Sequence, residues 1–125
     1  MLRGGRELAL GARVDPVFGP VVLVGDGGIY LEALQDFRLL VPPFDEHEVA
    51  DALARLRIAP ILAGVRGEAP ADTEAFCRMA VHLGNALIQW RDSVASIDIN
   101  PVKVLAAGEG AFAVDAVIEL VEREQ

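Results

Sequence analysis

The chain is poor in cysteine and has no long hydrophobic run. Cys77 is the single cysteine among 125 residues, so no internal disulfide can form. No apolar stretch approaches the roughly 20 residues that a membrane-spanning helix requires, and residues 1–6 lack the apolar core of a secretion signal. These absences predict a soluble, cytoplasmic protein without a membrane partner, in which Cys77 acts as a small buried hydrophobe.

Basic residues are also scarce, with 11 Lys and Arg against 19 Asp and Glu and a formal net charge of −8. This balance argues against a nucleic-acid backbone as a partner. An acidic protein that handles nucleotides needs a metal ion or a local basic group to offset the repulsion of the phosphates. The length suits a single domain with one hydrophobic core.

Turn signals and hydrophobic periodicity divide the chain into strands, two helices and strands again. Asp45 and Glu48 form a capping-box pattern before one helix, and Asp72 caps a second helix whose apolar stripe runs to Trp90. We expect extended segments at residues 7–14, 20–24, 29–34, 37–41 and 96–101, loops at 25–28 and 59–67, a hairpin over 102–117 and a charged tail from 119. This order predicts an α+β fold, a mostly antiparallel sheet with two helices packed on one face.

The most informative stretch is Ser96-Ile97-Asp98-Ile99-Asn100-Pro101, which Asp115 follows on the next strand of a hairpin. Side chains alternate faces along a strand, so Asp98 and Asn100 share the face opposite Ile97 and Ile99. Asp98, Asn100 and Asp115 would then bring three hard oxygen donors to one patch. Mg²⁺ accepts such a set, with waters and phosphates completing its coordination.

The register of the hairpin decides whether these donors meet. If the loop is residues 106–109, Asn100 lies opposite Asp115; if it is one residue longer, Asn100 faces Ala116 and the face flips. Pro101 cannot donate a ladder hydrogen bond, which indicates an edge or a bulge. The alternative is that Asp98 and Asn100 simply face solvent on a half-buried strand.

Other candidate groups carry weaker signals. The glycine-rich residues 25–28 could let a backbone approach a phosphate, although they match neither a Walker loop nor a dinucleotide fingerprint. Arg66 lies between glycines and could reach an anion. His47 and His82 have no neighbouring metal-ligand or nucleophile partner, so we assign them no role.

Several runs of residues carry a resemblance that extends from about residue 7 to residue 120. The runs are Glu7-Leu8 with Gly11, Asp15-Pro16-Val17-Phe18-Gly19-Pro20-Val21-Val22, residues 25–28 with Glu32 and Asp36, Leu62-Ala63-Gly64-Val65-Arg66-Gly67, and Asp98-Ile99-Asn100-Pro101 with Val114-Asp115-Ala116. Together they resemble the ADP-forming acyl-CoA synthetases, acetate–CoA ligases related to succinyl-CoA synthetase. The Asp-Pro-x-Phe-Gly-Pro and Asp-x-Asn-Pro runs are the most specific.

The resemblance implies an ATP-grasp fold, which clasps ATP between two lobes, and this chain is similar to the C-terminal lobe alone. Residues 1–125 would then be a single domain and a fragment of a longer protein. The N-terminal lobe and the CoA-binding and CoA-ligase domains would be its partners, and those domains would bind CoA and the acyl group. The isolated chain would be inactive.

The resemblance also implies residue roles in a ligase that passes a phosphoryl group between ATP or ADP and a histidine located elsewhere in the full protein. Asn100 and Asp115 would hold Mg²⁺, with Asp98 reaching the metal through water. Arg66 would have a catalytic place beside the nucleotide or the phosphohistidine. The nucleotide-binding set would be Glu7, Gly25, Gly27 and Gly28.

Two other functions stay open. The same lobe could sense nucleotide or acyl-CoA in an acyl-CoA synthetase-like protein acetyltransferase, or it could serve as a docking surface without catalysis. The docking reading predicts no Mg²⁺-dependent nucleotide binding even when the missing lobe is supplied. A missing lobe also leaves apolar sheet surface bare, which predicts a homo-oligomer.

Overall fold

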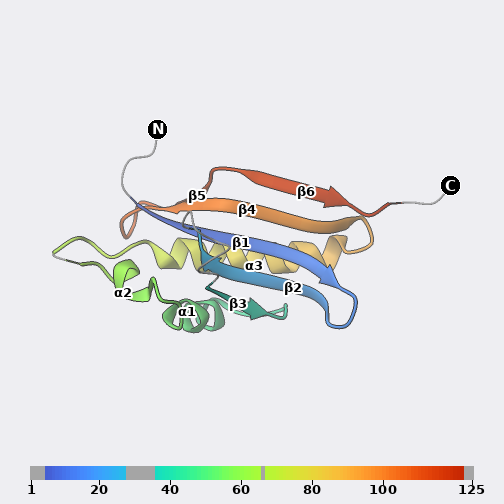
Figure 1. Ribbon diagram of the computed structural model, residues 1–125, viewed down its shortest axis with the longest axis horizontal. Coiled ribbons are helices and arrows are strands. Elements are labelled where there is room, and N and C mark those ends of the chain that lie inside the picture. The colour runs from blue at the N-terminus through green and yellow to red at the C-terminus, as the bar shows by residue number, and fades with distance from the viewer. Residues whose placement is uncertain (1–4, 28–35, 66, 123–125) are drawn as a thin grey trace.

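The computed structural model describes residues 5–27, 36–65 and 67–122. Within these ranges it has six strands and three helices (Figure 1). In chain order they are β1 (Arg6–Asp15), β2 (Gly19–Asp26), β3 (Phe37–Leu40), α1 (Glu46–Ala54), α2 (Ala59–Leu62), α3 (Thr73–Trp90), β4 (Val94–Val104), β5 (Ala111–Ala113) and β6 (Ala116–Leu120). None of the described helices is both long and apolar enough to cross a bilayer.

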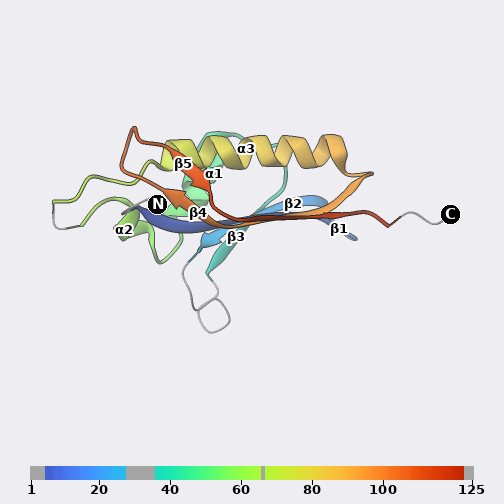
Figure 2. The same ribbon diagram turned by 90° about the horizontal axis from the view of Figure 1, so that it is seen from above.

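The described strands form one antiparallel sheet in the order β3-β2-β1-β4, and β5 and β6 both pair with the far edge of β4. β5 lies beside residues 102–104 of β4, and β6 lies beside residues 94–99. α1 and α3 lie on one side of this sheet, and α2 lies at one end of it; the side away from α1 and α3 is called here the open face (Figure 2). The predicted α+β fold is confirmed.

The hydrophobic core fills the space between the sheet and the two longer helices. On β1 and β2, residues of the same alternating set face the helices, and on α1 and α3 the buried residues recur every three or four positions. The fully or nearly fully buried members include Leu8, Leu10, Val22, Val24, Val49, Leu53, Phe76, Ala80, Leu83 and Leu87. Cys77 belongs to the same core, and burial raises the pKa of its thiol to about 11.

The helix starts follow the predicted capping patterns. At α1 the Asp45 carboxylate accepts a hydrogen bond from Glu48 N at 2.8 Å, and Glu48 Oε1 accepts one from Asp45 N at 3.4 Å. At α3 the Asp72 carboxylate accepts a hydrogen bond from Ala75 N at 3.2 Å. The short helix α2 lies where a loop was expected, because a single helical turn is too short to show a hydrophobic period.

The alternation of core-facing residues along β4 shifts by one residue halfway along the strand. Its pairing with β1 joins Leu10 to Ile99 but Leu8 to Val102, so β4 carries one extra residue in a bulge. The residues of β4 that face the core are Ile97 and Ile99 before the bulge and Val102 and Val104 after it. The bulge expected at Pro101 is confirmed, whereas an edge position is wrong, because β1 and the β5–β6 segments flank β4 on both sides.

Two expected segment boundaries are corrected. β2 continues through Asp26, where a loop over residues 25–28 was expected, and Gly27 N donates a hydrogen bond to Glu7 O at 3.0 Å. Pairing with β1 therefore extends the strand beyond the point where its apolar run ends. The expected charged tail starts too early, since Glu119 and Leu120 belong to β6. Gly28 and the extended segment expected at 29–34 lie outside the described residues.

Candidate functional site

The hairpin after β4 has the first of the two registers considered from the sequence. Leu105 N donates a hydrogen bond to Gly110 O at 3.0 Å, and Glu109 N donates one to Ala106 O at 2.8 Å. The loop is therefore residues 106–109, and Val102 pairs with Ala113. The longer loop, which would move every later side chain to the other face, is wrong.

This register places Asn100 opposite Asp115. Asn100 N donates a hydrogen bond to Asp115 O at 3.1 Å, and the next pair along the ladder joins Ile99 to Ala116. Residues directly opposed in an antiparallel pair are close neighbours, because their Cα atoms lie about 4.5–5.5 Å apart. Asn100 and Asp115 are both exposed, so the opposed pair is accessible from solvent.

Asp98 lies on the open face next to this pair. Ile97 and Ile99 pack against the core and Asp98 is exposed, as the alternation predicts. Asp98 pairs with Gly11 of β1, and a Cβ built on Gly11 would lie only 3.2 Å from Asp98 Oδ1. The missing side chain at residue 11 therefore leaves room for the carboxylate to lie over β1.

A hollow of about 310 Å³ adjoins Asp98 on this part of the sheet. Its floor includes the small residues Ala9, Gly11 and Gly25, with Phe37 at its border. Small residues allow a flat or phosphate-bearing ligand to approach the backbone closely.

The two described glycines of the 25–28 run also have a packing reason to be glycine. A Cβ on Gly25 would lie 2.7 Å from Asp36 O and 2.9 Å from Phe37 Cβ, and a Cβ on Gly27 would lie 2.7 Å from the backbone of Leu8. The sheet therefore requires glycine at both positions whether or not a nucleotide lies above them.

Glu7 forms an ion pair that the sequence did not indicate. Lys103 Nζ lies 3.2 Å from Glu7 Oε2, and the two residues pair across β1 and β4. Glu7 precedes the buried Leu8, and Lys103 lies between the buried Val102 and Val104, so both lie on the open face. Lys103 is the single lysine of the chain, and this scarcity was the one feature of the sequence that could have marked it as a candidate site residue.

Four other residues considered from the sequence are Gly28, Arg66, His47 and His82, and the structure describes only the two histidines. Arg66 and Gly28 lie outside the described residues. His82 is exposed on α3, and His47 is exposed on α1 with its Nε2 3.6 Å from Asp51 Oδ2. Neither histidine lies in the hollow beside Asp98.

Asp72 has a second function in the structure that its capping pattern did not reveal. One carboxylate oxygen caps α3, and the other, Oδ2, accepts hydrogen bonds from Gly108 N at 3.1 Å and Gly110 N at 2.8 Å. These bonds, with that from Gly110 foremost, hold the pKa of Asp72 below its ordinary value. Because the hairpin amides lie more than 30 residues away in sequence, no local pattern could indicate them.

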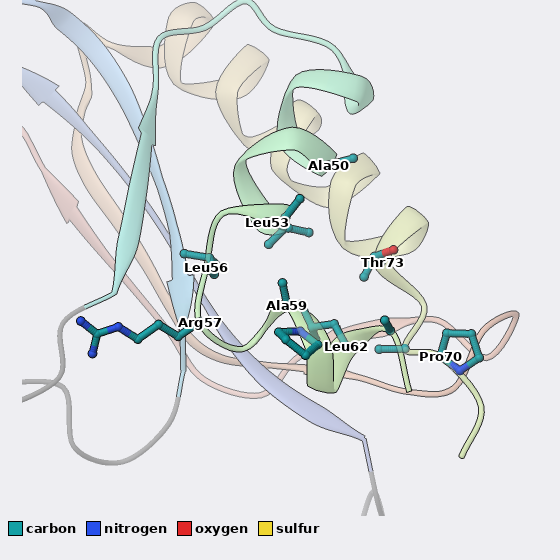
Figure 3. A pocket seen from close by; sticks show the side chains of 12 residues that line it. Ala50, Leu53, Leu56, Arg57, Ala59, Leu62, Pro70 and Thr73 are labelled. Atoms are coloured by element: carbon teal, nitrogen blue, oxygen red, sulfur yellow. The ribbon is translucent and has the colours of Figure 1, made fainter. Parts of the chain in front are cut away.

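A hollow larger than the one beside Asp98 lies elsewhere, among α1, α2 and the start of α3 (Figure 3). It measures about 670 Å³, and its walls are largely apolar, with Leu53, Leu56, Ala59 and Leu62 around it and Thr73 at one side. None of the predicted site residues lines it, so size alone does not mark the chemical site in this fold.

Comparison with known proteins identifies relatives that agree with this architecture. An acetate–CoA ligase (ADP-forming) II subunit beta from Pyrococcus furiosus is 40% identical over 120 residues, which are 96% of this chain and 51% of that protein. A trans-feruloyl-CoA synthase from an unknown prokaryotic organism is 43% identical over 95% of this chain, which is 16% of its own length. The chain thus spans about half of one curated relative and a smaller part of the other.

Solved structures show the same fold at high similarity. PH1788 from Pyrococcus horikoshii superposes with a TM-score of 0.90 and 36% identity, covering 98% of this chain and 52% of that one. A dinucleotide-forming acetyl-coenzyme A synthetase 1 from Candidatus Korarchaeum cryptofilum, in complex with coenzyme A and Mg-AMPPCP, superposes with a TM-score of 0.88 and 31% identity, covering 97% and 55%. The ATP-grasp domain family itself matches residues 1–120. The chain therefore belongs to the ATP-grasp family, and it is similar to part of the ADP-forming acetate–CoA ligases.

Proposed function

We propose that the chain supplies the Mg²⁺–nucleotide half-site of an ADP-forming acyl-CoA synthetase, with Asp98, Asn100 and Asp115 as the metal ligands. The observation that carries the proposal is the opposition of Asn100 to Asp115 across β4 and the β5–β6 segment. The curated relatives named as ADP-forming acetate–CoA ligases support the reaction class.

The chemistry of this donor set suits Mg²⁺. Two carboxylates and one amide oxygen are hard ligands, and all three side chains are exposed, which leaves space for water and phosphate oxygens. In the part of the chain that the structure describes, no three His, Cys, Asp or Glu side chains form a group that could hold a metal. The proposed set accordingly contains only two carboxylates and relies on Asn100 for its third donor.

A cation is needed because the chain is strongly acidic. Bound Mg²⁺ would neutralise charge on the nucleotide phosphates during transfer. Lys103 adds a local positive charge on the same open face, held in place by Glu7. These residues would position the phosphates, and in-line phosphoryl transfer asks little more of a protein than positioning and charge neutralisation.

The rest of the nucleotide site would come from both this chain and its partners. Glu7, Gly25 and Gly27 would line the nucleotide beside the hollow, and Gly28 and Arg66 complete the set expected from the family. The N-terminal ATP-grasp lobe would hold the other side of the nucleotide. The CoA-binding and CoA-ligase domains would carry CoA, the acyl group and the phosphohistidine, so the isolated chain should show no turnover.

The test is calorimetric titration of Mg·ADP into the protein that carries both lobes. Asn100→Ala and Asp115→Ala should each weaken Mg²⁺-dependent binding by at least about tenfold, because each removes a donor from the metal. Asn85→Ala and Asp92→Ala, at exposed positions on α3 and in the turn after it, are the matched controls and should bind like the wild type. Unchanged affinity in both site variants would refute the proposal.

The sensing alternative gives a different result in the same protein. It predicts Mg²⁺-dependent nucleotide binding that weakens in the site variants, with no formation of acyl-CoA from acid, CoA and ATP. The docking alternative predicts no Mg²⁺-dependent binding in the wild type.

A further inference from the structure

We propose that Asp72 is a positioning residue for the metal site, because its carboxylate fixes the hairpin turn whose length opposes Asn100 to Asp115. The part of this inference that concerns the metal rests on the function proposed above. The structural part rests on contacts between the start of α3 and the turn after β4.

Asp72 joins two elements that are distant in sequence. Its Oδ1 accepts a hydrogen bond from Ala75 N in the first turn of α3, and its Oδ2 accepts hydrogen bonds from both Gly108 N and Gly110 N. The residue is only 8% exposed and is the single buried charged residue in the described part of the chain. A buried carboxylate of this kind requires hydrogen-bond donors, and the turn supplies two of its three.

The backbone around Asp72 strengthens the same junction. Asp72 N donates a hydrogen bond to Leu105 O at 2.7 Å, and Ala107 N donates one to Pro70 O at 2.8 Å. Ala71 forms an isolated antiparallel bridge with Ala106. The segment of residues 70–72, just before α3, therefore lies against the turn after β4. Asp72 is the charged residue at the end of this segment.

The turn needs this support because the strand that follows it is short. β5 contains only three residues, and residues 114 and 115 belong to neither β5 nor β6, although hydrogen bonds from Asn100 N to Asp115 O and from Val114 N to Pro101 O cross this stretch. Gly108 and Gly110 have φ values of +87° and +97°, which favour glycine and which few other residues adopt. The Asp72 carboxylate stabilises the conformation of the turn in which the amides of Gly108 and Gly110 both point at Oδ2. In that conformation the loop is the four residues 106–109. A loop longer by one residue would put Ala116 in the place of Asp115.

A helix cap alone does not need this arrangement, as Asp45 shows. Asp45 caps α1 with the same carboxylate chemistry, but it is exposed, and its side chain accepts its hydrogen bond from Glu48 N in its own first turn. Asp45 therefore provides a matched control for the capping function.

The experiment compares Asp72→Asn with Asp45→Asn in the protein that carries both lobes. Asparagine is a good N-cap, so its carbonyl oxygen should keep the bond from Ala75 N, whereas the NH2 group that replaces Oδ2 cannot accept the hydrogen bonds from Gly108 N and Gly110 N. Two quantities are measured, the affinity for Mg·ADP and the amide hydrogen exchange of peptides covering residues 99–105 and 110–117. Asp72→Asn should exchange faster in both peptides and bind Mg·ADP roughly tenfold more weakly, as is typical when a residue that orients metal ligands is lost.

Asp45→Asn should match the wild type in both measurements. Asp72→Asn with wild-type affinity, beside a weakened Asn100→Ala, would overturn this inference and leave the proposed function standing. Wild-type affinity in Asn100→Ala and Asp115→Ala would remove both proposals.

If Asp72→Asn does not fold, Asp72→Ser replaces it, because a serine hydroxyl keeps the cap and reaches less far toward the turn. Unchanged exchange at residues 110–117 in Asp72→Ser would also overturn the inference.

Discussion

The two faces of the sheet are built from different kinds of residue. The helix-covered face carries large apolar side chains such as Leu8, Leu10 and Val24, all essentially unexposed. On the open face, the same strands carry Glu7, Gly11 and Gly25, with Leu23 beside them. Since both sets alternate along the same strands, one run of sequence encodes a core and a candidate binding surface together.

This difference shows how the fold and the proposed chemistry are separated. Substitutions on the covered face should change the free energy of unfolding, whereas those of polar side chains on the open face should change nucleotide binding with little effect on stability. The bulge in β4 and the hydrogen bonds between Asp72 and the hairpin turn link the fold to the proposed chemistry. Both determine which residues of the hairpin lie on the open face.

Phe76→Ala should produce the largest loss of stability. Phe76 of α3 is fully buried, and truncating a buried phenylalanine costs about 3–5 kcal/mol through lost burial and the cavity that remains. Phe112→Ala is the control, since Phe112 on β5 is 45% exposed, and it should lose less than half as much. Urea unfolding followed by circular dichroism measures both, and similar losses would contradict the comparison of the faces.

Gly25→Ala and Gly11→Ala should separate a packing glycine from one that leaves room for a carboxylate. The new Cβ at residue 25 meets the backbone of residue 36, which cannot move freely, so about 1–3 kcal/mol of stability should be lost. The single close contact of the new Cβ at residue 11, at 3.2 Å, is with the end of the Asp98 side chain, which can rotate. Gly11→Ala should therefore stay close to wild-type stability and bind Mg·ADP several-fold more weakly. The same loss of stability in both variants, with unchanged affinity in Gly11→Ala, would show that the space over residue 11 has no binding role.

The stability contributed by Asp72 should depend on pH. Its pKa is lowered in the folded protein, so its contribution is fully present above the unfolded pKa of about 3.9 and is lost as the pH falls through the lower folded value. The difference in unfolding free energy between wild type and Asp72→Asn should therefore be constant between pH 7 and 5 and should shrink toward pH 2. Urea unfolding at several pH values measures it, and a difference that persists undiminished at low pH would contradict the role of the charged carboxylate.

The Glu7–Lys103 pair should affect stability least. Both side chains are partly exposed, and ion pairs of this kind contribute about 0–1 kcal/mol and weaken with salt. Lys103→Ala should therefore leave the unfolding free energy nearly unchanged, yet weaken binding of Mg·ADP a few-fold in low salt. The control is Arg13→Ala, which removes an exposed cation from β1 and should leave the affinity unchanged. A stability loss of several kcal/mol in Lys103→Ala would show that the pair is structural.

Several features were accessible from local sequence because local physics determines them. Asp45 and Asp72 cap helices through bonds to amides three residues away, and the apolar stripe of α3 follows the helical period. The alternation around Asp98 correctly separated the core side of β4 from the open face. The α2 turn and the continuation of β2 through Asp26 could not be predicted in this way, because one is shorter than a period and the other depends on pairing with β1.

The sequence by itself determined the fold class, the helix starts and the identity of the oxygen donors, since capping, hydrophobic period and side-chain chemistry are properties of neighbouring residues. It left two registers open for Asn100 and Asp115. Only the tertiary structure chose between them, through a buried carboxylate at Asp72 that holds amides more than 30 residues away. The physical reason is that hairpin register depends on which loop amides find an acceptor, and that acceptor comes from another part of the fold.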